Sequence, residues 1–90
     1  MLRVTTAGDD PTSYRLRVEG RLVGASSIEI LRQELAGAAA TVRPVVVEIS
    51  GLMFADEEGI TLLAAAAERG VKLVGCSPWL ASLLEGASSP

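Results

Sequence analysis

Three consecutive carboxylates, Asp56, Glu57 and Glu58, precede Gly59 and form the densest group of reactive side chains in this 90-residue chain. Successive residues on a helix point about 100° apart, so Glu57 and Glu58 do not face one substrate atom as an acid–base pair would. The segment also lacks the Asp-x-Asp-x-Asp-Gly spacing that is typical of a calcium loop. We therefore predict neither a catalytic carboxylate pair nor a metal site here.

Other catalytic groups are scarce. The sequence contains no histidine, which removes the usual general base and the commonest transition-metal ligand. The single cysteine, Cys76, has no histidine to activate it, and we expect it to pack in the core or at a helix edge rather than to act as a nucleophile. No glycine-rich phosphate loop is present, and an acidic helix start would repel phosphate. These features predict a protein that is not an enzyme and carries no cofactor.

The charge composition argues against two classes of binding partner. Eight basic and eleven acidic residues give a net charge of −3, which argues against nucleic acid and against an anionic membrane surface. The longest uncharged apolar run, 59–67, is far shorter than the ~20 residues of a membrane span. We expect a cytoplasmic protein with one domain over 1–90, comprising a core of about 2–86 and a frayed tail at 87–90.

Hydrophobic patterning predicts four strands, over 2–6, 14–19, 45–49 and 71–75. Apolar and charged residues alternate from Tyr14 to Glu19, as in a strand with one solvated face. The segment from Val45 to Ile49 is almost continuously apolar, which is typical of a strand covered on both faces. Its exception, Glu48, is expected near water at the strand's carboxyl end, the alternative being a functional site. Turn chemistry predicts a turn at 8–11, and we expect a loop at 50–55.

Three helices are predicted between and after these strands. The first begins at Ser26, which could form a capping box with Glu29, and runs to about Ala39; an exposed phosphorylation site is the alternative for Ser26. The second runs from Asp56 to Arg69 and is stopped by Gly70. The third begins at Ser77-Pro78 and ends at Gly86. The side chains expected to face the core are Ile28, Leu31, Leu35, Ala38, Ile60, Leu63, Ala64, Ala67, Trp79, Leu80, Leu83 and Leu84. An exposed partner anchor is the alternative for Trp79.

The resulting order is β-β-α-β-α-β-α, which predicts an α/β fold. Strands separated by a helix lie parallel, so we expect a small, mostly parallel four-stranded sheet with an antiparallel pair at its N-terminal side. Functional sites in such sheets gather at the carboxyl ends of the strands. The segment 51–56 lies at such an end.

The segment from Val45 to Ile60, VVVEISGLMFADEEGI, resembles the signature of STAS domains, the fold of the bacterial anti-sigma factor antagonists. In that family a hydrophobic strand leads through Phe-x-Asp-Ser-Ser-Gly-Leu into a helix. The segments 16–22 and 69–78 are similar to the strand before this signature and to the later strand with its Ser-Pro helix start. The resemblance covers roughly 16–84 and implies a STAS-like, non-catalytic regulatory module that binds a protein partner, by analogy an anti-sigma factor or kinase-like protein.

The resemblance also implies a phosphorylation switch at the serine that directly follows the aspartate. Glu57 stands at that position and Glu58 at the next, so neither can accept phosphate. A phosphoserine carries about −1.5 to −2 charges, and two glutamates supply comparable permanent charge. We hypothesise a surface fixed in a state similar to the phosphorylated one; the alternative is that the acidic turn is only a helix cap and dipole partner. The expected partner-binding residues are Asp56, Glu57, Glu58, Gly59, Thr61 and Glu68.

Two further expectations follow from the resemblance. STAS domains also serve as accessory subunits of membrane transporters, and a constitutively bound subunit would need no phosphorylatable serine. Sigma-regulating members usually continue with another strand and helix after the segment like 78–84. We therefore expect a less covered sheet, and either a homodimer or a tight complex with another protein.

Overall fold

The structure, a computed structural model, describes residues 2–6 and 12–88; the predicted turn at 8–11 and the last two tail residues lie outside the described residues. The predicted order β-β-α-β-α-β-α is confirmed. The elements are β1 (Leu2–Thr6), β2 (Tyr14–Leu22), α1 (Gly24–Ala39), β3 (Val45–Ala55), α2 (Glu57–Glu68), β4 (Lys72–Val74) and α3 (Pro78–Ser88).

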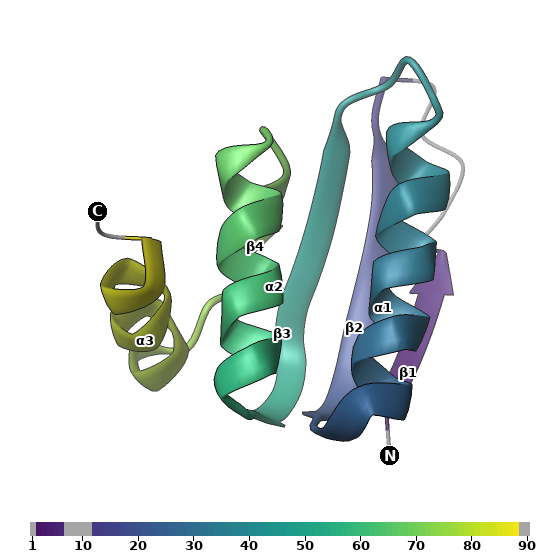
Figure 1. Cartoon of the computed structure of the whole chain (residues 1–90). Helices are drawn as coiled ribbons and strands as arrows, with labels where there is room; N and C mark the ends of the chain where they lie inside the picture. Colours follow the sequence, from purple (N-terminus) through teal and green to yellow (C-terminus); the bar gives the residue numbers. More distant parts are fainter. Residues whose placement is uncertain (1, 7–11, 89–90) are drawn as a thin grey trace.

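The four strands form one sheet in the order β1-β2-β3-β4. The β1–β2 pair is antiparallel, whereas β2–β3 and β3–β4 are parallel, as the sequence predicts. Helices α1 and α2 lie side by side against one face of this sheet, and α3 lies beyond α2 (Figure 1). None of the described helices is both long and apolar enough to cross a membrane.

The core lies between the sheet and the α1–α2 layer. It is built by alternate strand residues, and Leu16, Val18 and Val47 have no exposed surface. Leu31 of α1 and Leu63 of α2 close the core from the helix side. The predicted core faces of α1 and α2 are confirmed except at the end of α2, where Ala66 is buried and Ala67 is exposed.

The face of the sheet opposite α1 and α2 is not covered by those helices, so the expectation that Val45–Ile49 is covered on both faces was wrong. Glu48 lies in the middle of β3 on this face and not at its carboxyl end. Its carboxylate accepts a hydrogen bond from Arg17 Nε at 3.2 Å and lies 3.8 Å from a guanidinium nitrogen of Arg15. This face of the sheet therefore carries ion-paired polar side chains, which are compatible with contact with solvent.

The expected loop at 50–55 is instead the second half of β3. It pairs in parallel with Glu19–Leu22 of β2, which also runs three residues further than predicted. Two register shifts interrupt this pairing, between Arg17 and Glu19 and between Gly20 and Arg21. Pairing with β2 satisfies the backbone of a segment whose glycine and small residues look loop-like.

Helix α1 begins at Gly24 rather than Ser26, so the predicted Ser26–Glu29 capping box is wrong. The N-cap residue is Val23, whose side chain makes no capping hydrogen bond. Gly24 has φ of +82°, a conformation that glycine adopts without strain, and its N–H is capped by a side chain distant in sequence.

Helix α3 begins at Pro78 as predicted but continues through Gly86 to Ser88. Leu80 and Leu84 are buried as expected. The expectation that Trp79 and Leu83 face the core was wrong, because both are exposed. Cys76 is also exposed, in the segment between β4 and α3, so it does not pack in the core. Helix α3 packs against α2 at the margin of the domain, so only one narrow side of it meets apolar neighbours.

Candidate functional site

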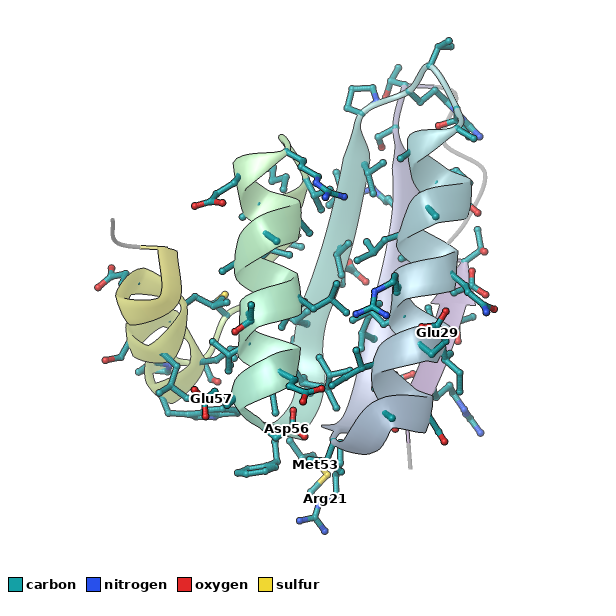
Figure 2. The ribbon with its side chains drawn as sticks, in the orientation of Figure 1. Arg21, Glu29, Met53, Asp56 and Glu57 are labelled. Carbon is teal, nitrogen blue, oxygen red and sulfur yellow. The ribbon has the colours of Figure 1, made fainter. Side chains whose placement is uncertain are left out.

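Two helix starts meet at one edge of the domain. Strand β2 ends at Leu22 and leads into α1, while its parallel neighbour β3 ends at Ala55 and leads into α2. Figure 2 shows Arg21, Met53, Asp56 and Glu57 together at this edge. The predicted site segment 51–56 therefore ends at the carboxyl ends of the parallel strands, although its first five residues belong to β3 itself.

Asp56 links both helix starts through one carboxylate. Its Oδ1 accepts a hydrogen bond from the Gly59 N–H at 2.8 Å, which caps α2. Its Oδ2 accepts another from the Gly24 N–H at 3.0 Å, which caps α1. The Asp56 N–H donates to the Leu22 carbonyl at 3.1 Å, which ties α2 to β2. The hydrogen bonds from Gly24 and then Gly59 favour the charged form and hold the Asp56 pKa below its usual value.

Gly59 allows α2 to approach β2 closely. A Cβ atom at this position would lie 2.9 Å from Leu22 Cγ and 2.9 Å from the Leu22 carbonyl oxygen. Both residues are buried. Asp56 and Gly59 thus build the turn, and they set the backbone from which neighbouring side chains project.

Glu57 and Glu58 differ from Asp56 in their surroundings. Both are exposed, and their carboxylates form no hydrogen bond or ion pair with another residue within 2–6 and 12–88. Both occupy the first turn of α2, where negative charge complements the helix dipole. They are therefore free to contact a molecule that approaches this edge.

Thr61 and Glu68 are exposed on the same side of α2 as Glu57, because positions four and eleven residues apart share a helix face. The Thr61 hydroxyl donates to the Glu57 carbonyl at 2.9 Å, which fixes its rotamer. Four of the six predicted binding residues, Glu57, Glu58, Thr61 and Glu68, are thus exposed. The other two, Asp56 and Gly59, support them from within.

The sequence reasoning missed the apolar part of this edge. Met53 is 76% exposed and Phe54 is 46% exposed, side by side near the end of β3. The Arg21 guanidinium lies 5.8 Å from the centre of the Phe54 ring, within cation–π range. Strand alternation gives no signal for this pair: Leu52 and Ala55 are both buried, and the register shift between Gly20 and Arg21 leaves both residues between them exposed.

Within the described residues, no group of three acidic, cysteine or histidine side chains is placed to hold a metal. Partial burial raises the pKa of the Cys76 thiol, which disfavours the nucleophilic thiolate. What remains is a surface with two exposed residues of apolar character, one arginine and a row of carboxylates, which suits recognition of another molecule.

Comparison with known proteins agrees with this fold. The family model described as "Mlab, STAS domain" matches residues 5–88, nearly the whole chain. The chain belongs to the STAS domain family. The predicted resemblance is thereby confirmed at the level of the family, which is generally non-catalytic.

Two solved structures share the STAS fold. The anti-sigma factor antagonist SpoIIAA in its unphosphorylated form superposes with a TM-score of 0.69 at 19% identity, over 92% of this chain and 82% of that chain. An antisigma-factor antagonist STAS domain from Rhodobacter sphaeroides gives 0.61 at 23% identity, over 98% and 91%. No curated protein sequence matches the chain.

Proposed function

We propose that this STAS domain is a non-catalytic regulatory module that binds a protein partner through the acidic–apolar edge, which we define as Arg21, Met53, Phe54, Glu57, Glu58, Thr61 and Glu68. The observation that carries the proposal is that the three carboxylates differ in hydrogen bonding and exposure. Asp56 caps both helices, whereas Glu57 and Glu58 are exposed beside an uncovered Met53.

The different surroundings of the three carboxylates argue against the alternative interpretation, in which the acidic turn is only a helix cap. Capping needs one acceptor, and Asp56 supplies it to both helices. Glu57 and Glu58 contribute to the helix dipole, at about 0.3–1 kcal/mol each, without any hydrogen bond that would hold them in place. Interaction with the helix dipole would explain the two glutamates, but it would not explain why the neighbouring strand exposes Met53 and Phe54.

The permanent charge defines the regulation that we propose. Glu57 stands where sigma-regulating relatives are expected to carry a phosphorylatable serine, so this edge remains negative without a kinase. A partner that recognises it presents basic groups around an apolar pocket, and its affinity falls as salt rises. By analogy with the structural relatives, an anti-sigma factor is the leading class of partner.

A transporter complex is the second class of partner. The absence of a hydroxyl at both Glu57 and Glu58 favours it, because a constitutively bound subunit needs no phosphorylation cycle. The identity of the captured partner separates the two classes: a kinase-like regulator supports the first and a transporter component supports the second.

The proposal is tested by photo-crosslinking in the native cell. Benzoylphenylalanine replaces Met53 in one variant and Val42 in a control, since Val42 is 103% exposed and lies before the opposite end of β3. We expect a discrete protein adduct from position 53 that disappears when Glu57→Gln and Glu58→Gln are added. Equal adducts from both positions, or an adduct that survives the two substitutions, would contradict the proposal.

A further inference from the structure

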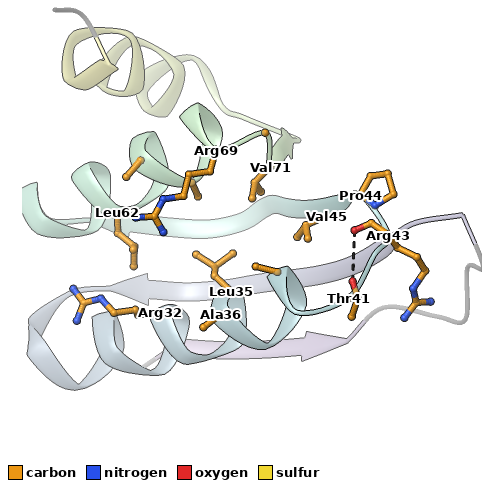
Figure 3. A pocket seen from close by; sticks show the side chains of 14 residues that line it. Arg32, Leu35, Ala36, Thr41, Arg43, Pro44, Val45, Leu62, Arg69 and Val71 are labelled. Carbon is orange, nitrogen blue, oxygen red and sulfur yellow. Dashed lines mark hydrogen bonds between the residues drawn. The ribbon is translucent and has the colours of Figure 1, made fainter.

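A cavity of about 450 Å³ opens at the other end of the domain, between the C-terminal halves of α1 and α2 and above the start of β3 (Figure 3). This volume lies within the ~300–1,000 Å³ that is common for small-molecule sites. Its wall includes Arg32, Leu35, Val45, Leu62, Arg69 and Val71. It shares no lining residue with the acidic–apolar edge, and the two surfaces come closest in the sequence at Glu68, which precedes Arg69.

The charge of this cavity is opposite to that of the chain. Three arginines, Arg32, Arg43 and Arg69, line it, and none of its described lining residues is acidic, although the net charge of the protein is −3. The Arg32 guanidinium is held by Glu29 at 2.8 Å, and Arg43 lies over the Tyr14 ring at 5.4 Å. Arg69 has no hydrogen bond or ion pair from its guanidinium to the rest of the chain that the structure describes.

The position of Arg69 favours a role toward the cavity. It directly follows α2, and in Figure 3 its side chain extends back along α2 toward Leu62, which also lines the cavity. Three of the last four carbonyls of α2 do not need its guanidinium. Ala65, Ala66 and Ala67 already accept hydrogen bonds from the backbone N–H groups of residues 69–71 at 3.1–3.2 Å. The guanidinium can therefore serve an anion with its two parallel N–H donors.

The aliphatic lining of the cavity indicates the chemistry of the uncharged part of the ligand. Leu35, Val45, Leu62 and Val71 provide aliphatic surface, and no aromatic ring lies among the described lining residues. A volume of 450 Å³ has room for about 15 non-hydrogen atoms, at the ~30 Å³ that each water molecule occupies in the liquid. We propose that this cavity binds an aliphatic monocarboxylate of medium chain length, with the carboxylate on Arg69 and the chain between α1 and α2.

The proposal is tested by amide NMR titration of the intact protein with octanoate, 1-octanol and acetate. Octanoate carries both charge and chain, while each of the other two carries one of them. We expect octanoate to shift amides around Leu62, Arg69 and Val71 with a dissociation constant on the order of millimolar, as suits a ligand of about ten atoms. Octanol and acetate should each bind at least tenfold more weakly.

Matched variants locate the site. Arg69→Gln removes the proposed carboxylate partner and should weaken octanoate binding roughly ten- to hundredfold, since a hydrogen bond to a charged group is lost. Arg3→Gln removes an exposed cation on β1, away from the cavity, and should leave binding unchanged. Ala65→Leu narrows the cavity and should weaken octanoate and octanol alike. Equal affinity for octanoate and octanol, shifts outside the cavity, or unchanged binding by Arg69→Gln would overturn the proposal.

Discussion

The close approach of α2 to β2 at Gly59 gives the sharpest test of the architecture that presents the acidic–apolar edge. In Gly59→Ala the new methyl group would lie 2.9 Å from both Leu22 Cγ and the Leu22 carbonyl oxygen, about half an ångström inside ordinary contact. Leu22 is fully buried, and its carbonyl accepts the Asp56 N–H, so neither atom can move away freely. Helix α2 must shift instead.

Two opposing effects determine how much Gly59→Ala changes the free energy of unfolding. Overpacking of this kind costs about 1–3 kcal/mol, and the helix propensity of alanine over glycine returns up to ~1 kcal/mol. We expect a net loss of about 1–2 kcal/mol in the free energy of unfolding. Gly37→Ala in α1 is the matched control, because a Cβ there meets nothing within 4 Å. It should stabilise by about 0.5–1 kcal/mol.

Thermal and urea unfolding, followed by circular dichroism, measure the pair. The two variants should differ by about 2 kcal/mol, which corresponds to roughly 8–16 °C in Tm for a domain of this size. If Gly59→Ala gained as much stability as Gly37→Ala, the α2–β2 contact described here would be absent, and the placement of Glu57 and Glu58 would fall with it.

Three further predictions concern individual charges. The pKa of Asp56 is lower in the folded chain than its unfolded value near 3.8. The charged Asp56 carboxylate therefore stabilises the fold fully above pH 3.8, and this stabilisation is lost as pH falls through the folded-state pKa. Asp56→Asn should lower Tm at pH 7 and flatten the dependence of Tm on pH in the acid range. Glu48→Gln should cost about 0.2–1 kcal/mol in low salt and less in high salt, measured by urea unfolding, since its partners on the open sheet face are half exposed. Glu57→Ser should make the chain a phosphate acceptor for a kinase of the STAS-regulating type, detected by intact mass, whereas phosphate on Ser50 of the wild-type chain would contradict the fixed-charge hypothesis.

The fold was largely predictable because its signals are local. Alternation from Tyr14 to Glu19, the apolar run at Val45–Ile49 and the helical stripes each follow from the period of one element. The order of elements then left little choice of topology. The sequence could not show that residues 50–55 continue β3, because their pairing partner is β2, about thirty residues away.

The errors share one physical origin, which is contact between distant residues. Ser26 and Glu29 fit a local capping pattern, but Gly24 is capped by Asp56 from the other helix. Trp79 has an apolar neighbour four positions on, yet α3 lies at the margin and leaves both exposed. The acidic turn was recognised from sequence, whereas its separation into one structural carboxylate and two exposed ones required the hydrogen bonds of Asp56.

The affinity of the purified crosslinked partner tests the central claim most directly. Isothermal titration calorimetry compares the wild-type chain, the Glu57→Gln/Glu58→Gln variant and Glu34→Gln, which removes an exposed carboxylate from α1 outside the edge. We expect the double variant to bind at least about fivefold more weakly, a loss of roughly 1 kcal/mol, and the control to bind as the wild type does. Equal dissociation constants for all three proteins would contradict the account.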